Sequence, residues 1–316
     1  MSFVSACSAV MTVFCVGLIG FLLKRKGLVG DEVVKALPPF LTTLVIPPYL
    51  VRSITTTFAH DQLLSLLSNS VIPLVSIFFT FLIAFLAAWV CAIRKGRRGT
   101  FITAFSTSNS MNIGLPIGLA LYGEAAVPYV LLYFFANVVS FWTFGNYMLS
   151  RDGEEPPTGI FNLQALRRIF SPPFLGVICG IFLVVCDWQL PVFLDKTFKY
   201  FGDMIVGIAL MYIGMLMAEV RCADIRLERD ICLVFVGRVV VAPLIIVLIS
   251  RFFPMPPLMF HVFLIQSSLP VMVNLAIQCG YYKGDVAYSA ILVSTTTMLA
   301  MVTVPFWAIV GGYLVP

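Results

Sequence analysis

Ser108-Asn109-Ser110-Met111-Asn112-Ile113-Gly114-Leu115-Pro116 is a polar stretch inside an otherwise hydrophobic segment of the chain. A second polar stretch lies at the matching place in the second half and reads Gln266-Ser267-Ser268-Leu269-Pro270-Val271-Met272-Val273-Asn274. A membrane span tolerates proline, glycine and amide side chains where its backbone lines a cavity in the protein instead of facing lipid. Two such breaks at equivalent positions in two halves are typical of a transporter's substrate site.

The composition explains why the surrounding segments are read as membrane spans. The chain has 316 residues, of which 60% are hydrophobic and 11% are charged, and its mean hydropathy is +1.01. Because about 25% of the residues of a soluble domain are charged, no soluble core could absorb this sequence, and the solvent must be the bilayer. The longest polar stretch runs from Ser150 to Arg168, so no separate soluble domain is expected.

Apolar segments of the length that crosses a bilayer, roughly 20 residues, recur along the whole chain. We therefore predict an all-α integral membrane protein with ten transmembrane helices. The expected spans are 3–23, 36–56, 67–92, 100–121, 124–149, 170–187, 196–219, 230–252, 258–280 and 284–313.

Lysine and arginine collect on alternate loops between these spans. One side holds Lys24, Arg25, Lys26, Lys35, Arg94, Lys95, Arg97, Arg98, Arg151, Arg167, Arg168, Arg221, Arg226, Arg229 and Lys283. The other side holds only Lys196, Lys199 and Arg251. Because positive loops stay in the cytoplasm, we expect a multi-pass protein of the plasma membrane with both termini outside. The net charge of +5 therefore orients the chain and does not indicate nucleic-acid binding.

The two halves of the chain resemble each other. Leu121-Tyr122-Gly123-Glu124-Ala125-Ala126 aligns with Tyr281-Tyr282-Lys283-Gly284-Asp285-Val286-Ala287 at the offset that also superimposes the two breaks. Each half carries five spans, and five is odd, so the second copy must enter the membrane upside down. We predict inverted five-helix repeats at 1–149 and 170–316, joined by a short cytoplasmic loop at 150–169, with broken helices four and nine crossing.

The breaks carry the residue types that could hold an anion. Pro116 cannot donate a backbone hydrogen bond, and Gly114 relaxes the backbone beside it. A helix that restarts after such a break presents free N–H groups and partial positive charge, which attract a carboxylate or a phosphate. The candidate substrate-binding residues are Asn109, Asn112, Gly114, Pro116, Ser267, Ser268, Pro270, Asn274 and Arg238.

Structural interpretations of the same residues stay open at this point. Each break could be a proline kink whose amides bond neighbouring helices. Arg238, about 8 residues inside its span, could neutralise an anionic substrate, but it could equally pair with Glu219 or extend toward the cytoplasm. Asn137 and Asn146 favour helix–helix contacts over ligand binding.

Several chemistries find no support in the sequence. No span carries adjacent aspartates at its centre, which argues against an antiporter that uses a carboxylate relay. The two histidines, His60 and His261, fall near span ends, and no metal cluster, phosphate loop or Ser/His/Asp arrangement is visible. We therefore expect neither an enzyme nor a bound cofactor.

The motifs of the chain resemble those of the auxin efflux carrier family. The first is Asn109-Ser110-x-x-x-Gly114-Leu115-Pro116 followed by Tyr122-Gly123, and the second is Leu269-Pro270-x-x-Val273-Asn274-x-Ala276 followed by Tyr282. The closing stretch, Val293-Ser294-Thr295-Thr296 through Val304-Pro305-Phe306-Trp307, is similar to the last span of that family. The resemblance covers essentially the whole chain.

The resemblance implies a scaffold domain, a transport domain with the crossed helices, elevator-like movement and an anionic carboxylate substrate. It assigns Asn109, Pro116, Pro270 and Asn274 to the breaks of the family. Asn112 departs from the family pattern, which has an apolar residue there, and this favours a small polar acid over indole-acetate. The resemblance also suggests a homodimer.

Together, these observations predict a secondary transporter of a small organic anion that works in contact with membrane lipid. A sodium-coupled organic-acid symporter of the same fold is the nearest alternative, because sodium held by unwound carbonyls would leave no clear sequence trace. A membrane sensor or receptor is an alternative of a different class, which ten spans and an inverted repeat disfavour.

Overall fold

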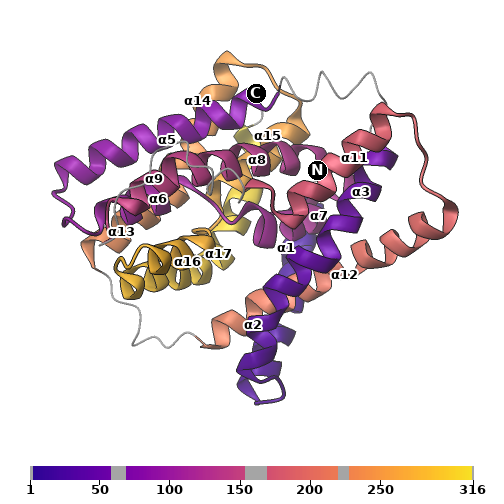
Figure 1. Ribbon diagram of the computed structural model, residues 1–316, viewed down its shortest axis with the longest axis horizontal. Coiled ribbons are helices and arrows are strands. Elements are labelled where there is room, and N and C mark those ends of the chain that lie inside the picture. The colour runs from indigo at the N-terminus through magenta and orange to yellow at the C-terminus, as the bar shows by residue number, and fades with distance from the viewer. Residues whose placement is uncertain (1–2, 58–68, 154–168, 220–227, 315–316) are drawn as a thin grey trace. The chain divides into compact units, whose positions relative to one another are not determined.

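The computed structural model describes residues 3–57, 69–153, 169–219 and 228–314 of the chain (Figure 1). Most of the expected loop 150–169 lies outside these residues, as do Arg167, Arg168, Arg221 and Arg226. Within the described ranges the regular structure is helical apart from one isolated bridge between two single residues. The prediction of an all-α protein is therefore confirmed.

Helix is present in each of the ten segments that the hydropathy indicates. In the first half the α-helices are α1 (Phe3–Arg25), α2 (Asp31–Phe40), α3 (Ile46–Thr57), α5 (Val71–Val90), α6 (Arg98–Ser106), α7 (Leu115–Tyr122), α8 (Val127–Ser140) and α9 (Asn146–Ser150). In the second half they are α11 (Pro172–Val185), α12 (Val192–Glu219), α13 (Arg229–Val236), α14 (Ala242–Phe252), α15 (Pro257–Ser268), α16 (Asn274–Tyr281) and α17 (Val286–Leu314). Wider π-helical turns cover Leu41–Val45, Ser110–Gly114, Phe141–Gly145 and Gly237–Val241.

Several of these helices have the length and composition needed to cross a membrane. Within the described ranges six qualify, namely Asp31–Thr56, Val71–Val90, Glu124–Ser150, Val192–Ala218, Arg229–Phe252 and Val286–Leu314. The exposed side of α5 is strongly apolar, since Phe78, Phe85 and Trp89 are 58%, 53% and 73% exposed. Such a surface would be a liability in water and suits contact with lipid.

The chain divides into two compact units, and each unit takes segments from both halves of the sequence. Unit 1 comprises Met1–Ser70, Met111–Leu132 and Phe170–Glu219. Unit 2 comprises Val71–Ser110, Tyr133–Ile169 and Val220–Pro316. The predicted repeats at 1–149 and 170–316 describe sequence symmetry, so their boundaries differ from those of the units.

Unit 1 is held by close helix pairs. The helices α1 and α12 lie side by side, as do α3 and α11 (Figure 1). At the first pair, a Cβ added to Gly214 would lie 1.8 Å from the carbonyl oxygen of Gly17, and a Cβ added to Gly20 would lie 2.0 Å from that of Met211. Glycine is therefore required on both helices, as is typical of tightly packed membrane helices.

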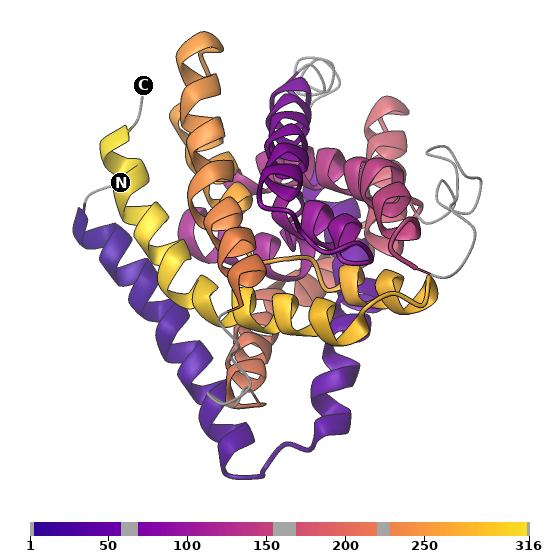
Figure 2. The ribbon, with the colours of Figure 1, turned by 90° about the vertical axis from the view of Figure 1, so that its left-hand side faces the viewer.

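Unit 2 contains the last helix, α17, which packs against α15 and α16 (yellow in Figure 2). The helix α14 packs against both α5 and α15, and α6 packs against α5 and α9. The core of this unit contains fully buried aromatic side chains, including Phe101, Phe141 and Phe260. Several unusual polar residues lie within the same core, and the candidate site is built from them.

Candidate functional site

The first break lies between α6 and α7. The helix α6 ends at Ser106, and Thr107 is extended with φ −111° and ψ 143°. The Thr107 hydroxyl donates back to the carbonyl of Thr103 at 2.8 Å, a local bond that competes with helix continuation. Pro116 itself lies in the first turn of α7, directly after the π-helical turn Ser110–Gly114, so it does not interrupt the helical segment Ser110–Tyr122. The helix is therefore interrupted at residues 107–109, well before Pro116, the proline from which the sequence predicts a break.

The second break lies between α15 and α16. The helix α15 ends at Ser268, and Leu269 is extended with φ −64° and ψ 155°. The residue before a proline is driven out of the helical region by the proline ring, so Pro270 accounts directly for this conformation. The helix α16 begins at Asn274.

The two breaks meet each other in unit 2. Ser108 and Val271 form an isolated antiparallel bridge, and the Asn109 N–H donates to the Pro270 carbonyl at 2.9 Å. Extended residues in an apolar core must find partners for their backbone groups, and these partners come from the opposite break. The meeting of the two breaks is thus a direct consequence of interrupting both helices.

Each break is also supported by a polar side chain from a later helix. The Ser108 N–H donates to Asn137 Oδ1 at 2.9 Å, and Asn137 Nδ2 donates to the Ser108 carbonyl at 2.8 Å. The Val271 N–H donates to Thr296 Oγ1 at 3.1 Å. Asn137 lies on α8 and Thr296 on α17, the fifth and tenth expected spans. Each support therefore comes from the helical segment that follows the broken one.

Arg238 is the charged residue of this region. Its side chain is fully buried (0% exposed), so it does not extend to a helix end. Its Nε donates to the Leu269 carbonyl at 3.0 Å, and its Nη2 donates to the carbonyls of Ser267 at 2.7 Å and Leu269 at 2.9 Å. A longer contact of 3.5 Å joins its Nη1 to the carbonyl of Phe105.

The hydroxyls of Ser267 and Ser268 point back along their own helix. Ser267 Oγ donates to the Leu264 carbonyl at 2.7 Å, and Ser268 Oγ donates to the Ile265 carbonyl at 2.9 Å. The bond from Ser268 satisfies the Ile265 carbonyl, one of the last four carbonyls that the end of α15 leaves without helical partners. In this arrangement the two hydroxyls can accept a hydrogen bond from a substrate, but their protons are already committed.

Other buried polar atoms at the breaks have no protein partner in the structure. These are both side-chain polar atoms of Gln266, the hydroxyl of Ser106 and Oδ1 of Asn112. Leaving such a group unpaired costs about 1–3 kcal/mol, so water or a ligand normally satisfies it. Gln266 and Ser106 are not among the residues expected from the sequence, although an amide four residues before Pro270 in an apolar segment is a usable signal for Gln266.

The predicted site residues divide between the two units. Asn109, Ser267, Ser268, Pro270, Asn274 and Arg238 belong to unit 2, whereas Asn112, Gly114 and Pro116 belong to unit 1. Within unit 2 the structure brings Asn109 and Pro270 into contact and links Arg238 to Ser267. Asn274 opens α16 and is half-buried.

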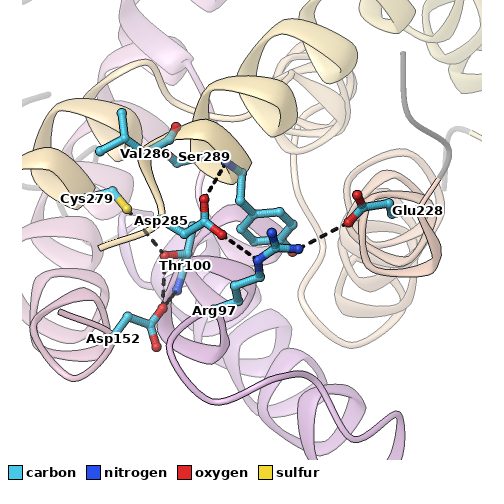
Figure 3. A network of polar contacts seen from close by, with 9 residues as sticks. Arg97, Thr100, Asp152, Glu228, Cys279, Asp285, Val286 and Ser289 are labelled. Carbon is cyan, nitrogen blue, oxygen red and sulfur yellow. Dashed lines mark hydrogen bonds and ion pairs between the residues drawn. The ribbon is translucent and has the colours of Figure 1, made fainter. Parts of the chain in front are cut away.

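A second polar cluster joins the ends of helices in unit 2 (Figure 3). Arg97 Nε donates to Asp285 Oδ2 at 2.7 Å, and its Nη1 donates to Glu228 Oε2 at 3.2 Å. The guanidinium also lies 4.6 Å from the centre of the Tyr288 ring. The carboxylates are 30% and 44% exposed, so each ion pair contributes modestly. The cluster ties α6, α13 and α17 together and is a structural feature.

Asp152 is a third acid in this region, and it is bound to the start of α6 through Gly99 and Thr100 (Figure 3). Its carboxylate accepts hydrogen bonds from the Gly99 N–H at 2.9 Å, the Thr100 N–H at 2.6 Å and the Thr100 hydroxyl at 2.9 Å. Burial nevertheless raises the pKa of Asp152 above its ordinary value, because it outweighs these donors. Asp152 thus caps the start of α6, the helix that leads into the first break.

Comparison with known proteins agrees with the helical architecture. The sequence pattern of the Membrane transport protein family matches residues 5–308 of the chain. An uncharacterized transporter of Methanocaldococcus jannaschii is 22% identical over 94% of this chain and 96% of its own length. A candidate malonate transporter of Rhizobium meliloti is 26% identical over 68% of this chain and 67% of its own length.

These matches confirm the resemblance read from the break motifs. A pattern that covers nearly the entire chain, together with relatives that are named as transporters, establishes a multi-pass membrane protein. The chain belongs to the Membrane transport protein family, the family of the auxin efflux carriers.

Proposed function

We propose that this membrane transporter carries a small organic anion, a mono- or dicarboxylate, which binds where its two broken helices meet. The observation that carries the proposal is the fully buried positive charge of Arg238 beside two interrupted helices. A buried charge at membrane depth is costly and is retained where it serves function or pairing. A positive potential at this point favours an anion over a neutral or cationic solute.

The polar groups around the breaks suit a carboxylate. The start of α16 carries partial positive charge, the amide of Gln266 offers donors, and Asn109 and Asn274 lie at the two breaks. We propose that Ser267, Ser268 and Pro270 shape this surface, and Asn112, Gly114 and Pro116, which belong to unit 1, remain candidates from the sequence. The malonate named for the Rhizobium meliloti relative supports testing dicarboxylates of that size.

We further propose an elevator-like, alternating-access mechanism built on an inverted repeat. The supports of the two breaks, Asn137 and Thr296, each come from the helical segment that follows the broken one, which favours this symmetry. In this proposal the protein resides in the plasma membrane with both termini outside and assembles as a homodimer. The membrane and the orientation are argued from the distribution of lysine and arginine, and the homodimer from the family resemblance alone.

The first test is the thermal stability of the purified protein with a panel of small carboxylates, including malonate and malate. One acid should raise the melting temperature of the wild type, and the Asn109→Ala/Asn274→Ala variant should lose this response while remaining folded. The exposed Thr197→Ala change on α12 provides a matched control that should retain it. A folded wild type that responds to no acid would refute the anion proposal and favour a sensor or a transporter of another solute.

The same experiment separates the sodium-coupled alternative. Each acid is measured in sodium chloride and again in potassium chloride of equal ionic strength. Stabilisation in both salts supports a carrier that does not need sodium for binding. Stabilisation confined to sodium would favour the symporter, because a ligand raises stability only when its bound state forms.

A further inference from the structure

We propose that Arg238 is a positioning residue: a fixed cation that holds the C-terminal ends of α6 and α15 at the meeting point of the two breaks. Its guanidinium contacts backbone carbonyls from both helix ends, namely Phe105 of α6 and Ser267 and Leu269 at the end of α15. The role in substrate binding rests on the proposed function, whereas the role in holding the breaks together does not.

The hydrogen-bonding capacity of the guanidinium is largely used on these carbonyls. A guanidinium has five N–H donors in a rigid fork. The Nε donor and Nη2 face Ser267 and Leu269 at 2.7–3.0 Å, and Nη1 faces Phe105. Few donors remain for a substrate, so Arg238 acts on an anion through its charge more than through direct contact.

The charge of Arg238 matches what two helix ends require. The C-terminus of a helix carries roughly half a negative elementary charge, because its last carbonyls have no helical partners. Two such ends meet in the apolar core of unit 2, and together they amount to about one negative charge. The guanidinium counters the repulsion between these two ends, and the start of α16 adds partial positive charge at the second break.

The local fold positions this cation. Gly237 and Arg238 open the π-helical turn Gly237–Val241, which carries an extra residue in its ring of hydrogen bonds. A Cβ on Gly237 would lie 2.4 Å from the ring of Phe105, so only glycine lets this turn approach α6. The Trp307 Nε1–H donates to the Val239 carbonyl at 2.7 Å and satisfies the loosened backbone.

The consequence is a rigid meeting point that presents the substrate groups in one arrangement. By bonding the carbonyl of Leu269, the residue before Pro270, Arg238 keeps the Pro270 carbonyl where the Asn109 N–H donates to it. Removal of the charge should let the two helix ends repel and separate. Both breaks should then loosen together, although Asn137 and Thr296 still support each one individually.

The test is hydrogen exchange of backbone amides in residues 106–110 and 268–273, measured without substrate. Arg238→Met should accelerate exchange at both breaks by about tenfold or more, which corresponds to about 1.4 kcal/mol. Arg238→Lys should show a smaller increase, because it retains the charge without the fork. The control is Trp307→Phe, which removes a neutral donor to the adjacent carbonyl and should loosen the turn at 237–241 without loosening both breaks.

Chemical rescue separates a charge effect from a packing defect. The variant Arg238→Ala is purified with and without methylguanidinium, which fits the space left by the side chain. Restored protection at both breaks, or recovery of folded protein only in the presence of methylguanidinium, supports the proposal. Wild-type exchange in Arg238→Met, or an Arg238→Ala variant on which methylguanidinium has no effect, overturns it.

The two proposals can fail separately. If exchange behaves as expected but no carboxylate binds, the positioning role of Arg238 stands and the anion proposal falls. Suppose instead that Arg238→Lys and Arg238→Met both bind an acid with the affinity of the wild type, and that Arg238→Met also shows wild-type exchange. The anion proposal then stands, and the positioning role of Arg238 falls.

Discussion

At the scale of single residues, side chains supply hydrogen-bond partners to the extended backbone at the breaks, which lies in an apolar core. Asn137 shows the solution most clearly, because one amide pairs with both backbone groups of Ser108 as a neighbouring strand would. The sequence suggested only that Asn137 joins helices. Its actual partner, an interrupted segment, could not be read from a pattern because the contact joins residues from different helices.

Replacement of Asn137 should therefore destabilise the first break. Asn137→Leu leaves the N–H and the carbonyl of Ser108 without this partner, and we expect a loss of about 2–5 kcal/mol in the free energy of unfolding. The measurement is the melting temperature of the purified protein. Ser140→Ala, about one turn further along α8, should have a small effect, and an equally small effect of Asn137→Leu would mean that water replaces the amide.

Asp152 should make stability depend on pH in a defined direction. Burial raises the pKa of Asp152 above its ordinary 3.8 in the folded protein, so the folded state favours the protonated acid. Below pH 3.8 both states are protonated and the effect vanishes. As the pH rises through the folded pKa, the side chain must be buried as an anion, and its contribution to stability falls.

Comparison with Asp152→Asn isolates this contribution, since the amide keeps an acceptor oxygen and does not titrate. The melting temperature of the wild type, relative to that of the variant, should decrease as the pH is raised from acid toward neutral. An increase over the same range would show that the three donors from Gly99 and Thr100 outweigh burial.

At the scale of elements, glycine decides how closely helices approach. In unit 1 the helices α1 and α12 meet where a Cβ on Gly214 would strike the carbonyl oxygen of Gly17 at 1.8 Å. Backbone atoms cannot move aside as a flexible side chain does. The contact therefore depends on the absence of a side chain at this position of α12.

We expect Gly214→Ala to separate α1 from α12 and to lower the free energy of unfolding by about 1–3 kcal/mol. Gly207→Ala is the matched control on the same helix, because nothing lies within 4 Å of its added Cβ. This control should be neutral or slightly stabilising, since alanine favours a helix over glycine. Equal melting temperatures for the two variants would contradict the close packing of α1 on α12.

The elements also show where proline signals succeed and where they mislead. Pro270 lies in the second break and forces Leu269 out of the helix, as the sequence indicates. Pro116 instead belongs to the first turn of α7, and the first break lies at Thr107–Asn109. A proline can start a helix as readily as it can end one, so the pattern located a break without specifying its residues.

At the scale of the whole molecule, the alternation of basic loops predicts an orientation in the membrane. Cysteines introduced singly at the exposed positions Lys95 and Lys196, in a background without the natural cysteines, provide the test. A reagent that does not cross the membrane should label the cysteine at 196 from outside and the cysteine at 95 only after the membrane is opened. The reverse pattern would invert the topology, and equal labelling would contradict the count of spans.

The sequence by itself determined the membrane class, the helical segments and the two breaks, because hydropathy and proline act locally along the chain. Only the tertiary structure decided that Arg238 bonds carbonyls at helix ends, that Asn137 and Thr296 support the breaks, and that each compact unit draws on both halves. It also assigned Gln266 to the buried polar groups without a protein partner. These features depend on contacts between residues that are far apart in the sequence, and a local sequence pattern does not specify such contacts.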